Sequence, residues 1–214
     1  MGGRITGLRR QTRKRDRVDV YLDGKCAFGL ASVVAAELAV GQDLTAAEVD
    51  RLRQLDAVED ACQRAMRLLS RRPRSERELR TYFACHGIQD PVQQGALARL
   101  QERGYLDDES FARFWIEGRQ TFRPRSARAL QAELRQKGIP SEVIHLALAG
   151  LDEDGAAYQA ARLAARKLRR ASEEDFRRKL GGHLARRGFN HETIRPVVER
   201  VWNEMSGPDV GSEA

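Results

Sequence analysis

Apolar residues recur three or four positions apart over most of this chain, which predicts a mainly α-helical fold. The helical pattern also repeats. The tetrapeptide Arg-Pro-Arg-Ser occupies 72–75 and 123–126, and each copy leads into a helix that should end at Gly87 or Gly138. A looser third copy ends at Gly188, so the three glycines lie 51 and 50 residues apart. A fixed period of this length is typical of repeat proteins.

Both ends of the repeated helix carry recognisable end signals. Ser75 and Ser126 are suited to cap an N-terminus, and Ser75 with Glu78 predicts a capping box. At each C-terminus a glycine has an apolar residue four positions before it and another directly after it. This arrangement predicts a Schellman cap with the glycine in the left-handed conformation. The four glycines that fit are Gly87, Gly104, Gly138 and Gly188.

The apolar positions correspond between the copies, so each copy predicts a three-helix bundle of about fifty residues. The aligned sets are Leu79, Leu130 and Leu180; Phe83, Leu134 and Leu184; and Leu100, Leu151 and Val201. A bundle of this size buries only a small core, so neighbouring modules should help to hold it.

Strand-like alternation is confined to residues 4–30. Val18, Val20 and Leu22 alternate with polar positions, and Asp23-Gly24 is a strong hairpin turn signal. A returning strand over 26–30 and a third strand over 5–8 would complete a small sheet. We expect helices over 31–38 and 45–55 to follow, the second opened by a capping box between Thr45 and Glu48, and a further helix over 59–70.

The predicted fold class is therefore mainly α: tandem three-helix repeats that resemble helix-turn-helix units, preceded by a small β-hairpin and helix module. A final segment rich in Gly, Pro, Ser and acidic residues is expected to be a disordered acidic tail. The predicted bounds are 1–57 for the N-terminal module, 58–106, 107–151 and 152–205 for the three repeats, and 206–214 for the tail.

The charge balance favours a polyanionic partner. The 214 residues carry a net charge of +7, and the sequence pI is about 9.8. This suits nucleic acid or a nucleoprotein, although a soluble helical protein with a heavily charged surface would look the same. Three cysteines without ligand spacing fit a reducing, cytoplasmic location, and no apolar run approaches the ~20 residues of a membrane span.

Chemistry-bearing motifs are missing from the sequence. The four histidines lack the partners of a zinc site, and no phosphate-binding loop or nucleophile motif occurs. The acidic cluster at 107–109 begins a predicted helix, where it suits the helix dipole better than a metal. The aromatic residues mostly fall at core spacing, so base-stacking platforms are not indicated. We expect a non-enzymatic binding protein without metal or cofactor.

Basic residues are the candidates for partner contact. A run over 9–17 holds six positive charges, and it is either a solvated hairpin loop or an arm that contacts phosphates or an acidic surface. Arginines also recur beside the second helix of each repeat, where they would form a discontinuous basic stripe. The candidate contact residues are Arg9, Arg10, Arg13, Lys14, Arg72, Arg74, Arg77, Arg119, Arg123, Arg125, Arg128, Arg177 and Arg178.

Several motifs together resemble the RecX family of bacterial recombination regulators. Residues 104–113 read GYLDDESFAR, and Trp115, RPRS at 123–126 and KGI at 137–139 follow them. The stretch RPRSEREL at 72–79 is similar to the first repeat of that family. The similarity extends over about 17–205 and includes the hairpin turn.

The resemblance implies an elongated, curved array of three-helix repeats that binds the RecA filament on single-stranded DNA along its helical groove. It further implies negative regulation of filament growth, ATP hydrolysis, strand exchange and coprotease activity, in DNA repair and the SOS response. A monomer acting in the cytoplasm is expected, with possible direct DNA contact. The alternative is a helical repeat protein that binds DNA directly, without the recombinase.

Overall fold

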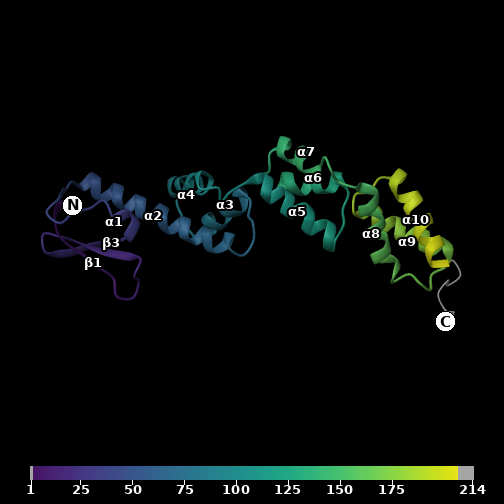
Figure 1. Cartoon of the computed structure of the whole chain (residues 1–214), viewed down its shortest axis with the longest axis horizontal. Helices are drawn as coiled ribbons and strands as arrows, with labels where there is room; N and C mark the ends of the chain where they lie inside the picture. The colour runs from purple at the N-terminus through teal and green to yellow at the C-terminus, as the bar shows by residue number, and fades with distance from the viewer. Residues whose placement is uncertain (1, 207–214) are drawn as a thin grey trace. The chain divides into compact units, whose positions relative to one another are not determined.

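The computed structural model describes residues 2–206 of the chain (Figure 1). Ten helices and four strands lie in this part, and the expected mainly α fold with a small N-terminal strand module is confirmed. The chain forms two compact units, Met1–Asp107 and Asp108–Ala214, and we describe each by itself. The predicted tail falls outside the described residues, apart from Ser206.

The N-terminal module is a four-stranded antiparallel sheet that contains β1 (Gly3–Arg10), β2 (Arg17–Leu22), β3 (Lys25–Ala31) and β4 (Asp43–Leu44). The strands lie in the order β3-β2-β1-β4. Asp23 and Gly24 make the predicted turn between β2 and β3, with positive φ angles of 48° and 80°. Ile5 of β1, Val20 of β2 and Leu30 of β3 are buried. No pattern in the sequence predicted the two-residue strand β4.

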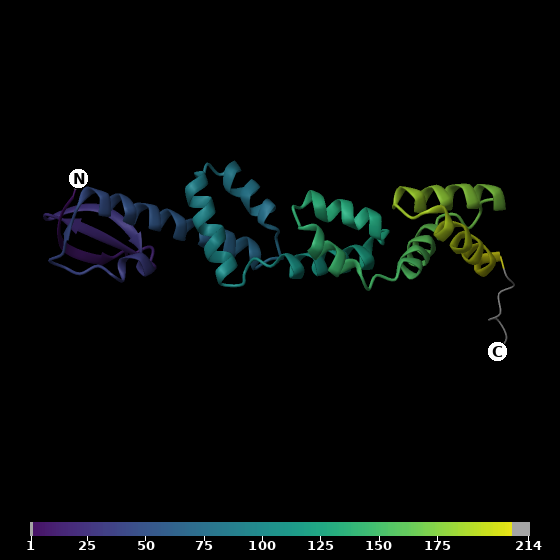
Figure 2. The ribbon, with the colours of Figure 1, turned by 90° about the horizontal axis from the view of Figure 1, so that it is seen from above.

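Helix α2 (Ala46–Leu69) joins the sheet to the first repeat (Figure 2). The capping box of Thr45 and Glu48 forms as predicted. The expected break between 55 and 59 is wrong, because one helix of 24 residues passes through it. Helix α1 (Ser32–Ala35) has four residues and is shorter than the helix over 31–38 that we expected.

An ion pair fastens the sheet to α2. Arg17 Nη2 lies 2.8 Å from Asp56 Oδ2, and it also donates to the Gly29 carbonyl at 2.9 Å. The other carboxylate oxygen of Asp56 accepts from the Ala31 backbone N–H at 2.6 Å. Asp56 therefore binds both the backbone at the end of β3 and the half-buried side chain of Arg17.

Replacing Asp56 with alanine should lower the free energy of unfolding by about 2 kcal/mol, because charged hydrogen bonds to two half-buried groups are lost. Asp60→Ala is the matched control. Asp60 lies one turn further along α2 and pairs with Arg64 at 2.7 Å, but these side chains are 38% and 43% exposed, and a pair of this kind is worth at most ~0.5 kcal/mol. Urea unfolding monitored by circular dichroism measures both; equal losses would show that Asp56 does not fasten the sheet.

In the first repeat α4 (Asp90–Glu102) packs against α2, and α3 (Glu76–Cys85) packs against α4. Side chains from the second half of α2 share one core with both helices. Leu79 and Phe83 from α3 are fully buried, and Leu97 and Leu100 from α4 meet them. The second repeat has α5 (Asp108–Phe122), α6 (Ala127–Gln136) and α7 (Ser141–Leu148). Its core contains Phe111, Leu130, Leu134, Ile139 and Ile144.

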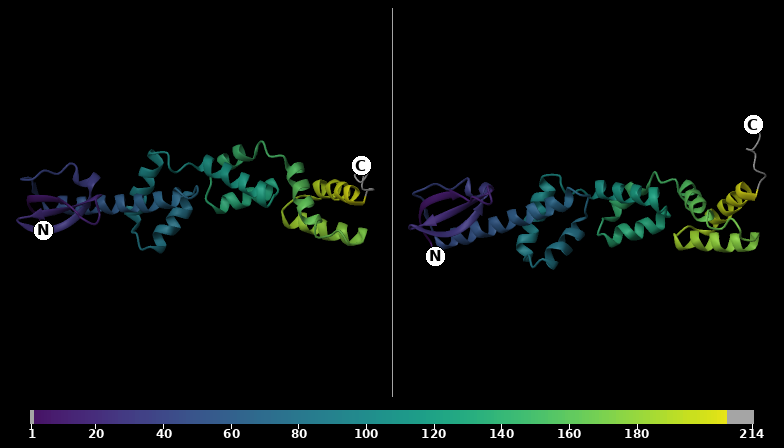
Figure 3. Two further views of the ribbon diagram at one scale, coloured as in Figure 1. Left: turned by 60° about the horizontal axis from the view of Figure 1, so that its bottom comes forward. Right: turned by 90° about the horizontal axis from the view of Figure 1, so that it is seen from below.

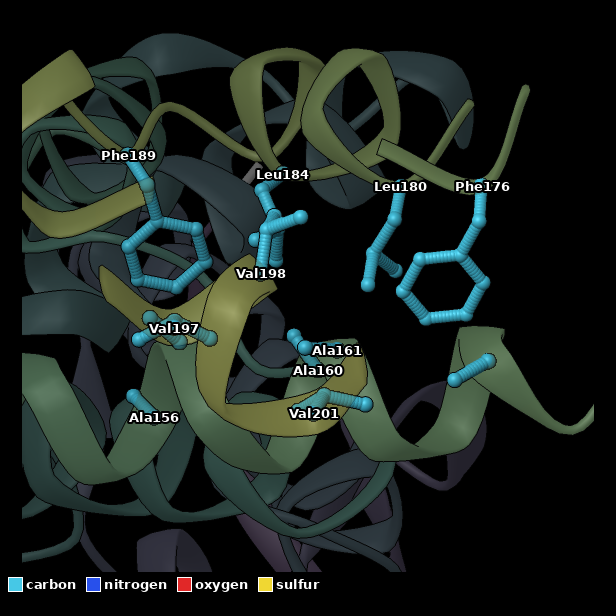
Figure 4. Close-up of a cluster of buried hydrophobic side chains, with 12 residues drawn as sticks. Ala156, Ala160, Ala161, Phe176, Leu180, Leu184, Phe189, Val197, Val198 and Val201 are labelled. Carbon is cyan, nitrogen blue, oxygen red and sulfur yellow. The ribbon is translucent and has the colours of Figure 1, made fainter. Parts of the chain in front are cut away.

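The third repeat contains α8 (Glu153–Ala165), α9 (Glu173–Arg186) and α10 (His191–Ser206), and its helices lie against one another in both views of Figure 3. Figure 4 shows large side chains projecting from α9 toward small ones on α8. Because five alanines of α8 are buried, the helix backbones can approach closely. The projecting side chains are Phe176, Leu180 and Leu184, and Val197, Val198 and Val201 of α10 close the core.

The predicted helix ends are confirmed almost throughout. All four glycines have positive φ, and the residue after each donates to the carbonyl five positions earlier, for example Ile88 to Phe83 at 3.1 Å. Ser75 accepts from the Glu78 N–H, but the Glu78 carboxylate pairs with Arg72 instead of completing a capping box. Leu151, which we aligned to a third helix, lies beyond the end of α7 and packs half-buried against the core.

The third repeat contacts the second through the turn after α9. The Ser126 N–H donates to the Arg187 carbonyl at 3.2 Å, and Arg187 Nη1 donates to the Pro124 carbonyl at 2.9 Å. Gly188, with φ of 92°, lies directly against Ser126 and Ala129. The C-cap of one repeated helix thus rests on the N-cap of another.

Candidate partner-binding surface

The arginines before α3 are held by the first repeat itself. Arg72 donates to both oxygens of Glu78, at 3.0 and 3.3 Å, and to the Pro73 carbonyl at 2.9 Å. Arg74 is half-buried, and its Nε has no hydrogen-bond partner among the described residues. Arg77, in the first turn of α3, is exposed. Of these three candidates, Arg77 has the side chain best placed to meet a partner.

The second repeat uses two of its candidate arginines internally. Arg119 Nε and Arg125 Nη1 both lie 2.8 Å from the carboxylate of Glu133, which also accepts from Trp115 Nε1 at 2.7 Å. Arg119 stacks over the Trp115 ring, 4.6 Å from its centroid, and Lys137 lies 4.8 Å from the same ring. This polar cluster joins α5 to α6. Arg119 and Arg125 therefore help to hold the second repeat together, whether or not they also contact a partner.

Arg123 and Arg128 differ from these neighbours. Both are exposed, and neither has an ion-pair partner within residues 2–206. Arg123 stands in the turn before α6, and Arg128 stands on its first turn. Because these guanidinium groups keep all their donors, they are available to carboxylates or phosphates of a partner.

Candidates in the third repeat are paired but exposed. Arg177 lies 2.6 Å from Glu173, and Arg178 lies 2.6 Å from Asp175. The hydrogen bonds of Arg178 and Lys179 hold the pKa of Asp175 below its usual value. Surface pairs of this kind contribute little to stability and exchange readily for other partners.

The basic run of the N-terminal module forms the β1–β2 loop and the strand ends beside it. Arg9 stacks on Tyr21 with its guanidinium carbon 4.8 Å from the ring centroid. Arg10, Arg13 and Lys14 are exposed. Both earlier interpretations of this run, solvated loop and contact arm, are compatible with exposed cations.

Groups typical of catalysis are not gathered in the described part of the chain. No three His, Cys, Asp or Glu side chains there could hold a metal ion. Burial raises the pKa of the Cys62 thiol, which keeps it protonated and unreactive, while Cys26 and Cys85 are exposed free thiols. None of the helices described here is both long and apolar enough to span a bilayer.

Sequence reasoning missed part of the basic surface. Lys167, His183, Arg186 and Arg187 were not among the candidate contact residues. These residues meet Arg123 at one pocket. Their proximity to Arg123 could not be inferred from the sequence, because they lie more than forty positions from Arg123 along the chain.

Comparison with known proteins gives a consistent result. Family models described as the first, second and third three-helix domains of RecX match residues 61–100, 107–148 and 152–198. The Regulatory protein RecX of Lactobacillus johnsonii is 30% identical over 210 residues, covering 96% of this chain and 77% of that protein. Its namesake from Mycobacterium leprae is 42% identical over 147 residues, covering 67% and 86%.

Solved structures support the fold. A crystal structure of regulatory protein RecX matches with a TM-score of 0.77 at 22% identity, over 92% of this chain and 98% of that one. RecX from Lactobacillus salivarius matches with a TM-score of 0.57 at 17% identity, over 69% and 97%.

Proposed function

Because this chain belongs to the RecX family of regulatory proteins, we propose that it is a negative regulator of the RecA recombinase. It binds the RecA filament on single-stranded DNA along the filament groove. Binding slows filament growth, ATP hydrolysis, strand exchange and coprotease activity during DNA repair and the SOS response. It acts as a cytoplasmic monomer and catalyses no reaction of its own.

The observation that carries this proposal is the tandem repetition of one three-helix domain, whose first two copies place exposed arginines without a described ion-pair partner beside the second helix. A filament presents the same surface again and again, so a chain with repeated domains can contact several subunits. Weak charged contacts then combine through effective concentration. Regulation follows when the bound chain favours one filament geometry over the active one.

The test is ATP hydrolysis by RecA on single-stranded DNA. Addition of this protein should lower the turnover at substoichiometric amounts. An Arg77→Gln, Arg128→Gln double variant should need several-fold more protein for the same inhibition, because two unpaired cations are lost. Arg195→Gln with Arg200→Gln is the control, since those arginines are paired with Glu199 and Glu204 on α10. Unchanged hydrolysis at equimolar protein would reject the proposal.

A second candidate function is direct DNA binding, which the net charge of +7 favours. Binding of labelled single-stranded and duplex DNA, with and without RecA, across a salt series separates the two. Tight and steeply salt-dependent binding to naked DNA, with no gain from RecA, would favour the alternative.

A further inference from the structure

A basic pocket opens between the second and third repeats, inside the second compact unit. Its volume is about 480 Å³, and it lies where the end of α5 meets α8 and α9. No acidic side chain of residues 2–206 lines it. The cationic or titratable residues that do are Arg123, Lys167, Lys179, His183, Arg186 and Arg187.

Most of this positive charge is not neutralised by the protein. Lys179 has a carboxylate partner, Asp175, at 3.1 Å. Arg187 donates to the Pro124 carbonyl, which carries no full charge. Within the part of the chain that the structure describes, Arg123, Lys167 and Arg186 have no ion-pair partner.

Two groups in the pocket respond to this excess charge. The pKa of His183 is lowered by burial and by the positive charges of Arg187, Arg186 and Lys167. The pKa of Arg187 is lowered by burial and by Arg125 and Arg123. Cations that repel one another in a concave, partly buried site are relieved by a bound anion.

The rim of the pocket is apolar and aromatic. Phe122, the last residue of α5, is 78% exposed, and Leu163 of α8 is 41% exposed. An exposed phenylalanine is an exception to the core placement that we expected for the aromatic residues. An aromatic ring beside unpaired cations is the combination that binds nucleotides, because the ring stacks on a base while the cations hold the phosphate.

We propose that this pocket binds a nucleotide, with its phosphate among Arg123, Lys167 and Arg186 and its base against Phe122. The nucleotide is either one unit of a single strand or a free nucleotide, since both present the same chemistry. The site belongs to this chain alone and needs no recombinase. It therefore goes beyond the proposed regulation of RecA and can fail or succeed independently of it, and it gives the second candidate function, direct DNA binding, a specific site.

The test uses the full chain and fluorescein-labelled oligothymidylate at low salt, with binding read by fluorescence anisotropy. A Lys167→Gln, Arg186→Gln double variant should bind at least about tenfold more weakly. The slope of its log affinity against log salt concentration should be smaller in magnitude by about 1.4. Phe122→Ser should weaken binding at least about fivefold through lost stacking. Because all three side chains are exposed, the variants should melt like the unmodified chain.

The Arg195→Gln, Arg200→Gln variant removes the same charge from the same repeat, away from the pocket, and should bind within about twofold of the unmodified chain. Competition identifies the source of the nucleotide: displacement of the probe by dTMP supports a free nucleotide, and displacement by unlabelled oligothymidylate alone supports a strand. Equal binding by the pocket and control variants would overturn the proposal. Equally effective competition by oligoglutamate would also overturn it, because the pocket would then accept any anion.

Discussion

Gly188→Ala should lower the free energy of unfolding of the second compact unit by about 2–5 kcal/mol. Two costs combine. The φ of 92° is a left-handed conformation, which costs a residue with a β-carbon ~1–2 kcal/mol. That β-carbon would also lie 2.5 Å from Ser126 Oγ and 2.8 Å from Ala129 Cβ, and overpacking of this kind costs a further ~1–3 kcal/mol.

Gly87→Ala separates the two costs. Gly87 ends α3 with a φ of 68°, but among the described residues no heavy atom outside its neighbours lies within 4 Å of a β-carbon placed there. Only the backbone strain of ~1–2 kcal/mol should appear. Urea unfolding of both variants provides the comparison. If Gly188→Ala costs no more than Gly87→Ala, the contact between the second and third repeats relaxes freely and our account of it is wrong.

Glu133→Ala should destabilise the second repeat by about 3–5 kcal/mol, because it leaves two arginines and an indole N–H without their shared acceptor. The Glu133 side chain is 14% exposed, so water replaces the carboxylate poorly. The two arginines would also repel each other across the vacated position. The Trp115 ring reports the change, and a Trp202→Phe background removes the other tryptophan from the fluorescence signal.

Glu173→Ala is the matched control for that substitution. Glu173 also pairs with an arginine, Arg177 at 2.6 Å, but both side chains are about half exposed. Its loss should change the free energy of unfolding by no more than ~0.5 kcal/mol. Urea unfolding should separate the two variants clearly. Similar midpoints would mean that the cluster around Glu133 contributes no more than an ordinary surface pair.

Local signals account for the parts of the fold that were predictable. The left-handed glycines, the serine caps and the Asp23-Gly24 turn each depend on residues a few positions apart, and all of them form. The break expected near residue 57 had no such signal. Residues 46–69 contain neither glycine nor proline to interrupt a helix.

Charge could be counted from the sequence, but its pairing could not. Arg119 and Arg125 look as available as Arg123, yet they meet Glu133 because α5 and α6 fold back on each other. The exposure of Phe122 depends on where α5 ends and what packs beside it. Identifying which residues of the candidate surface are free to contact a partner therefore requires the tertiary structure, even when the repeats can be recognised in the sequence.

The uninterrupted α2 determines where this protein can be shortened. Cutting the chain at residue 57 would divide a continuous helix and discard the Thr45 cap that begins it. The remaining half-helix supplies Val58, Ala61 and Ala65 to the first repeat's core, and it would start without a cap. A deletion meant to remove only the sheet would thus also weaken the first repeat, and loss of function in such a fragment would say nothing about the sheet itself.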